Sequence, residues 1–206
     1  MRVRSHLCTW YARPLGLELL VATSLLCIAV LWDVWRPVGL QRLLEWSPWS
    51  LPLGILAAIP PLLTIVLLEL PTSRRCSWGR QVHESLTAVL VPWLRHVHWR
   101  EILALACLAG LSEEVFFRGV LQQELGLILT ALVFGALHAI NIPYMLWAAL
   151  VGLYLGWLTL LAHNLWLPIV AHTVVDGVGL CYIRFVVVPR YSVLSAVWGT
   201  DKGAQG

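Results

Sequence analysis

Long apolar runs without charge constrain this chain more than any other feature of its sequence. The run Ile142 to Ala162 contains no charged residue, and neither does the run Leu125 to Ile140. A helix needs about 20 apolar residues to cross the hydrocarbon core of a bilayer. Only 12% of the 206 residues are charged and 59% are hydrophobic, whereas a soluble domain has about 25% charged residues. The chain is therefore expected to be an integral membrane protein.

The apolar runs predict an all-α fold, a polytopic transmembrane helical bundle with a polar intramembrane site. A short seventh segment from Val82 to Leu94 is expected to lie on the membrane surface or to enter it, so seven or eight segments are allowed. Residues 1–206 are expected to form a single integral membrane domain with a motif-bearing core at 101–188. About six spans are predicted, at 15–32, 50–70, 101–120, 124–140, 143–162 and 165–188.

The distribution of basic residues supports an even number of spans. With six spans, only Arg36 and Arg42 fall on the side opposite the other basic residues. Because basic residues collect on the cytoplasmic side, both termini are expected to be cytoplasmic. The residues on that side are Arg2, Arg4, Arg13, Arg74, Arg75, Arg80, Arg95, Arg100, Arg190 and Lys202. No dense basic run accompanies the net charge of +3, so no nucleic-acid partner is expected.

Three short polar patterns interrupt the apolar spans. They are EEVFFR at 113–118, FGALH at 134–138 and HTVVD at 172–176. A charged group in the middle of a membrane costs several kcal/mol, so each one is a hypothesis of function by default. Four other histidines lie in polar segments and are expected to be solvated: His6, His83, His96 and His98.

Helical spacing predicts a different place for each polar group. Glu114 and Arg118 are four residues apart, so they can form an ion pair on one face. Glu113 lies about 100° around the helix from Glu114 and has no local cation. His172 and Asp176 also share a face, as do Phe134 and His138, whose rings could pack together.

This arrangement favours hydrolytic chemistry. An unpaired carboxylate such as Glu113 can act as a general base near neutral pH, with His138 sharing the proton or orienting a water. His172 and Asp176 could stabilise a developing oxyanion or hold the substrate. Each pattern alone also has a structural interpretation, as an ion pair or a helix–helix polar contact. Three patterns on adjacent spans make independent structural explanations less plausible.

At these residues the sequence resembles the family of CAAX prenyl endopeptidases and bacteriocin-processing proteins, also called CPBP intramembrane proteases. Its pattern is E-E-x-x-x-R, then F-x-x-x-H, then H-x-x-x-N or H-x-x-x-D. The resemblance implies an intramembrane endopeptidase in which Glu113 and His138 activate water and His172 and Asp176 form the oxyanion or substrate pocket. It implies structural support by Glu114, Arg118 and Phe134. The expected partners are the lipid bilayer and a membrane-embedded or membrane-anchored peptide or protein substrate.

The short chain and the Asp176 at the end of the third pattern indicate a small bacterial member, expected in the inner membrane. The family has been described both as metal-dependent and as glutamate-type. Glu113, His138 and His172 could ligate zinc, but we favour a metal-free site and assign no cofactor.

Two other classes of protein remain open at this stage. One is a non-enzymatic membrane protein that retains the polar site, such as a proton-coupled transporter or an immunity or scaffold protein. The other is a haem-binding bundle with His138 and His172 as axial ligands. The sequence contains no H-E-x-x-H, G-x-G-D or G-x-S-x-G motif, so other types of intramembrane protease fit poorly.

Overall fold

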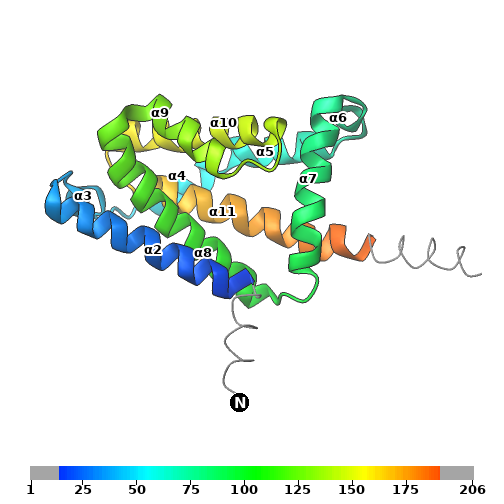
Figure 1. The fold of residues 1–206 in the computed structure, drawn as a ribbon, viewed down its shortest axis with the longest axis horizontal. Coiled ribbons are helices and arrows are strands. Elements are labelled where there is room, and N and C mark those ends of the chain that lie inside the picture. The colour runs from blue at the N-terminus through cyan, green and yellow to red at the C-terminus, as the bar shows by residue number, and fades with distance from the viewer. Residues whose placement is uncertain (1–13, 191–206) are drawn as a thin grey trace, which may run out of the picture.

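The computed structural model describes residues 14–190, apart from the side chain of Arg74, and every regular element within that range is helical. The predicted all-α transmembrane bundle is confirmed (Figure 1). Of the basic residues used above to predict orientation, Arg2, Arg4, Arg13 and Lys202 lie outside the described range, as does His6. The elements are α2 (Pro14–Trp35), α3 (Leu40–Leu43), α4 (Ser50–Ala57), α5 (Ile59–Glu69), α6 (Pro71–Arg75), α7 (Ser77–Leu94), α8 (Trp99–Phe116), η1 (Phe117–Leu121), α9 (Gln122–Leu137), α10 (Ile142–Ala162), α11 (Trp166–Tyr182) and η2 (Ile183–Val187).

Within the described range, five helical segments are long and apolar enough to cross a membrane. They are Pro14–Trp35, Ser50–Glu69, Trp99–Leu137, Ile142–Ala162 and Trp166–Arg190. The third segment contains two of the six spans expected from the sequence. It bends at Gly126, whose φ of 76° and ψ of 171° are not helical. Glycine suits this backbone because it has no Cβ, and α8 and α9 diverge from the bend as two arms (Figure 1).

The segment expected at Val82–Leu94 belongs to α7, which runs across the bundle instead of along it (Figure 1). Asn141, the N-cap of α10, donates hydrogen bonds to the Gln81 carbonyl and the Ser85 hydroxyl of α7. The expectation that His83 is solvated is wrong. Its side chain is only 14% exposed, and its Nδ1 lies 2.7 Å from Glu69 Oε1 on α5. These polar contacts attach α7 to two membrane helices.

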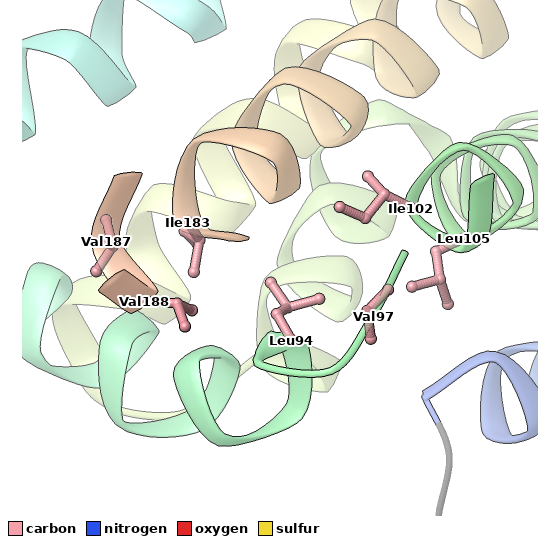
Figure 2. Close-up of a cluster of buried hydrophobic side chains, with 7 residues drawn as sticks. All are labelled: Leu94, Val97, Ile102, Leu105, Ile183, Val187 and Val188. Atoms are coloured by element: carbon pink, nitrogen blue, oxygen red, sulfur yellow. The ribbon is translucent and has the colours of Figure 1, made fainter. Parts of the chain in front are cut away.

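An apolar cluster fixes the turn between α7 and α8 against η2 (Figure 2). Leu94 ends α7, Ile102 lies in the first turn of α8, and Ile183 begins η2. Arg184 strengthens the contact by donating from Nε to the Val97 carbonyl at 2.9 Å. The buried members of the cluster are Leu94, Val97, Ile102, Leu105, Ile183, Val187 and Val188.

Glycines set the close approach of the helices that carry the polar patterns. A Cβ on Gly110 of α8 would clash with Thr173 Oγ1 and lie 3.0 Å from the Thr173 backbone nitrogen on α11. A Cβ on Gly152 of α10 would lie 2.9 Å from the ring of Phe134 on α9. Small residues allow helices in membranes to pack closely. The polar patterns on α8, α9 and α11 are thereby brought within reach of one another.

We predict that Gly110→Ala lowers the stability of the fold, because the added methyl group must push α8 away from α11. Overpacking of this kind costs about 1–3 kcal/mol, which corresponds to a loss of several degrees in Tm for a chain of this size. The control is Gly177→Ala, because a Cβ there would meet only Ala106 Cβ at 3.7 Å. Thermal unfolding in detergent checks this, and equal Tm values for the two variants would contradict it.

Candidate active site

A deeply buried polar contact joins Glu114, Arg118 and His172. Glu114 Oε1 accepts a hydrogen bond from His172 Nδ1 at 2.7 Å and forms an ion pair with Arg118 Nη1 at 3.0 Å. The side chains of Glu114 and Arg118 are 0% and 1% exposed. Arg118 Nη2 also donates to the Gly152 carbonyl at 3.0 Å. The predicted pair of Glu114 and Arg118 forms, and it links η1 and α8 to both α10 and α11.

A π-helical turn carries the arginine of this cluster. Arg118 lies within η1, which interrupts the α-helical path between α8 and α9. Such turns are rare and often occur at functional sites. The guanidinium carbon of Arg118 lies 4.6 Å from the centre of the Phe134 ring. Phe134 therefore contacts the buried cation as well as His138.

Glu113 points away from the ion pair, as its position one residue earlier predicts. Its side chain is 14% exposed, and its Oε2 lies 3.7 Å from His138 Nε2. Among the described residues, this oxygen has no hydrogen-bond partner. A separation above 3.5 Å is too long for a direct hydrogen bond and suits a bridging water. Glu113 is thus a carboxylate held close to an imidazole without being bound to it.

The orientation of His138 follows from its contacts on α9. His138 Nδ1 lies 2.8 Å from the Phe134 carbonyl oxygen. Because a carbonyl can only accept, Nδ1 carries the proton and donates it there. In the neutral ring, Nε2 then presents a lone pair toward Glu113. The ring also stacks on Phe134 with 4.3 Å between centroids, which limits its rotation as the sequence spacing predicts.

His172 and Asp176 form the opposite wall. His172 Nε2 lies 3.5 Å from Asp176 Oδ2, one turn later on α11. Glu113, His138, His172 and Asp176 all line one cavity of about 210 Å³. The other residues lining it are Leu90, Phe134, Tyr144, Trp147, Ala148, Val151, Leu155, Val175 and Leu180. All four residues that the sequence indicates as catalytic therefore face a common space enclosed by apolar side chains.

Two residues near this cavity were not indicated by sequence reasoning. Glu18 on α2 lines an adjoining cavity of about 200 Å³ together with Glu113 and Asp176. Its position within the first apolar run could have indicated a functional residue, because a charged side chain inside a membrane span costs free energy. Tyr144 on α10 lines the main cavity, and nothing in its sequence context distinguishes it from an ordinary interfacial tyrosine.

The metal set considered from the sequence does not fit the observed side chains. Among residues 14–190, no group of three or more His, Cys, Asp or Glu side chains is placed to hold a metal ion. The hydrogen bonds of His172 Nδ1 to Glu114 and of His138 Nδ1 to a backbone carbonyl leave only the Nε2 atoms to bind a metal. A tetrahedral zinc site needs its donors to converge on one point, and the described side chains do not converge in this way. The proposed mechanism therefore has no step on a metal.

Comparison with known proteins points to one family. Residues 95–178 match the family model described as type II CAAX prenyl endopeptidase Rce1-like. The chain is also similar to a Bacillus subtilis protein described as uncharacterized protein YpbD, with 38% identity over 96 residues. That match covers 43% of this chain and 49% of the relative, so the chain spans about half the length of the curated relative it matches. No solved structure matches.

We predict that Glu114→Gln destabilises the fold strongly, whereas Glu113→Gln does not. The first substitution leaves Arg118 buried without its carboxylate, and breaking a buried ion pair costs about 3–5 kcal/mol. The second changes a carboxyl group whose Oε2 makes no hydrogen bond among the described residues. Thermal unfolding of both variants in the same detergent tests this. Similar losses of Tm in the two would contradict the division of roles.

Proposed function

Because residues 95–178 match the type II CAAX prenyl endopeptidase Rce1-like family model, we propose that this chain is an intramembrane endopeptidase of the glutamate type. Its substrate would be a membrane-embedded or membrane-anchored peptide or protein. The observation that carries the proposal is the 3.7 Å gap between Glu113 Oε2 and His138 Nε2. Both atoms are hydrogen-bond acceptors, and a water between them can donate one proton to each.

In the proposed first step, Glu113 takes a proton from this water. The water oxygen attacks the carbonyl carbon of the scissile peptide bond, and the carbonyl oxygen becomes an oxyanion. His138 holds the second proton of the water through its Nε2 lone pair, which orients the nucleophile. Phe134 supports this geometry in two ways. Its ring stacks on the imidazole of His138, and its backbone carbonyl accepts a hydrogen bond from His138 Nδ1.

In the proposed mechanism, His172 stabilises the oxyanion. Its Nδ1 donates to Glu114, and Asp176 lies 3.5 Å from its Nε2. Carboxylates beside both nitrogens suit an imidazolium, whose Nε2 proton would be donated to the oxyanion. A fixed donor in a water-poor site is a strong source of transition-state stabilisation. Glu114 and Arg118 act only as positioning residues, because they fix the ring of His172 without touching the substrate.

In the second step the tetrahedral intermediate collapses. The electron pair of the oxyanion re-forms the carbonyl, the carbon–nitrogen bond breaks, and Glu113 returns its proton to the leaving amine. The products are a carboxylic acid and an amine. Water, peptide and protons balance without another reactant. The general base and the general acid are therefore the same carboxyl group in turn.

We further propose that the end of the bundle carrying α7 faces the cytoplasm of a bacterial cell. The start of α2 and the end of η2 lie at this end, while α3 lies at the other (Figure 1). Arg75, Arg80, Arg95 and Arg100 lie in or beside α6, α7 and the start of α8. Basic residues favour the cytoplasmic side. Both termini would then be cytoplasmic.

We predict that Glu113→Gln lowers the rate of peptide cleavage in proteoliposomes by at least about 100-fold, the lower range for loss of a general base. His138→Ala should have a similar effect because the water loses its second acceptor. Glu84→Gln, an exposed carboxylate on α7, is the matched control and should cleave at the wild-type rate. Cleavage products are followed by mass spectrometry. Full activity of Glu113→Gln would refute the mechanism, and pH-dependent uptake without cleavage would favour a transporter.

We also predict that removal of divalent metals leaves cleavage unchanged, because no step requires a metal. Purified protein is dialysed against a strong chelator, assayed with the same peptides, and analysed for bound metals. The control is a zinc peptidase treated in the same buffer, which must lose its activity. Loss of cleavage that returns when zinc is added would overturn the metal-free mechanism.

A further inference from the structure

Hydrolysis inside a membrane needs a supply of water, because the proposed reaction consumes one water molecule for every peptide bond that is cut. Apart from the four proposed catalytic residues, the lining of the catalytic cavity is mostly apolar. A cavity with apolar walls stays dry. The proposed function therefore requires a space that holds water and connects Glu113 with the surface of the membrane.

Three cavities adjoin one another between Glu113 and the turn that joins α7 to α8. The catalytic cavity and a middle cavity of about 200 Å³ share Glu113 and Asp176 in their linings. The middle cavity and an outer cavity of about 480 Å³ share Pro14 and Trp93. The start of α2, which carries Pro14, lies beside this turn (Figure 1). The cavities thus form a series of adjoining spaces from the turn to Glu113.

The outer cavity is the polar end of this series. Its lining includes Arg95, His96, His98 and Glu101, of which the first three are exposed. Charged side chains are costly inside a membrane, so this turn is expected at the surface of the bilayer, in contact with water. Water that enters here has only the middle cavity to pass before it reaches Glu113.

Glu18 distinguishes the middle cavity from an ordinary apolar space. Its Oε1 is buried and has no hydrogen-bond partner among the described residues. One water needs about 10–15 Å³ and two to four polar partners, so the volume suffices for several waters and Glu18 offers them a partner. Glu113 and Asp176 lie where this cavity meets the catalytic one. The other lining residues are apolar: Pro14, Leu17, Leu90, Trp93, Leu94, Leu105, Ala109 and Leu180.

Glu18 also lies part of the way from the turn to Glu113. It is one helical turn from Pro14 at the start of α2, about 6 Å along the helix axis. Glu113 is much further from Trp99 at the start of α8, about 20 Å along that axis. The two helices pack against each other and start at the same end of the bundle (Figure 1). Water that moves inward from the turn would therefore meet Glu18 before Glu113.

We propose that these three cavities form the route by which water reaches Glu113, and that Glu18 holds water in the middle of this route. Glu18 is then a positioning residue, because it acts on the water and does not touch the peptide. The route also gives a reason for an unpaired carboxyl oxygen within the first apolar span, where it is otherwise costly. This inference rests on the proposed endopeptidase function and deepens it.

The route can be tested without any substrate. In the full chain with its five cysteines replaced by alanine, Ala109→Cys or Ala131→Cys introduces a single thiol, which is treated in proteoliposomes with a small water-soluble methanethiosulfonate. Ala109 lines the middle cavity, whereas Ala131 is buried on α9 and lines none of the three. Buried thiols are inert, so we expect Ala109→Cys to react at least about tenfold faster than Ala131→Cys. Equal rates would overturn the route.

Glu18→Leu should slow both the labelling of Ala109→Cys and the cleavage of peptides. We expect kcat to fall at least about tenfold, the lower range for loss of one hydrogen bond to a charged group, with KM unchanged because the peptide does not touch Glu18. Glu18→Gln should keep most of kcat, because its amide still binds water. The matched control is Ser24→Leu, because Ser24 is an exposed polar residue of α2 that lines none of the three cavities. It should match wild type in labelling and in kcat.

The possible failures are distinguishable. Absence of any cleavage by wild type would sink the proposed function itself, and the labelling of Ala109→Cys with and without Glu18→Leu would still decide the route. Wild-type labelling and kcat in Glu18→Leu would overturn the role of Glu18. Equal losses of kcat in Glu18→Gln and Glu18→Leu would mean that Glu18 acts through its charge, and a change in KM alone that it contacts the peptide. Either result would also overturn that role. Thermal unfolding verifies that each variant is folded.

Discussion

The buried contact among Glu114, Arg118 and His172 is the constraint on which the rest of the site depends. A carboxylate and a guanidinium that are almost completely buried are tolerated because each meets the charge of the other. Glu114 Oε1 serves both Arg118 and His172, and Arg118 reaches a backbone carbonyl of α10. Three helices must take one relative position for these bonds to form. The buried ion pair therefore fixes the position of the His172 imidazole.

Helical periodicity then gives two adjacent carboxylates different environments. Glu114 is bound in the ion pair with Arg118. Glu113 lies about 100° away from it around the helix and faces the cavity. Glu113 Oε2 has no hydrogen-bond donor among the described residues, which is unfavourable for the fold. Residues of this kind persist in membrane helices when the activity requires them. This contrast gives a physical reason to assign the chemistry to Glu113 and the architecture to Glu114.

Contacts within one helix could be predicted from the sequence, whereas contacts between helices could not. The spacing of four residues predicts the pair of Glu114 and Arg118, the proximity of His172 to Asp176, and the stacking of Phe134 on His138. It cannot predict that His172 Nδ1 selects Glu114, because that bond depends on the packing of α8 against α11. The pairing of His83 with Glu69 was missed for the same reason. The break predicted between the spans 101–120 and 124–140 occurs a few residues later, at Gly126, because glycine is the residue that adopts this backbone conformation most readily.

A site built in this way leaves little polarity for recognising a substrate. Glu114 is occupied by the ion pair, and Glu69 by His83 and Tyr182. In the proposed mechanism, Glu113, His138, His172 and Asp176 all act on the peptide bond, which is the same in every substrate. Discrimination among substrates would then come from the shape of the apolar walls and from the depth at which a peptide bond can reach Glu113. Selection by an apolar pocket distinguishes a missing methylene group by only about 10- to 200-fold and does not strongly reject an isostere that adds a hydroxyl. Under the proposed function, the protein is therefore expected to tolerate many sequences around the scissile bond.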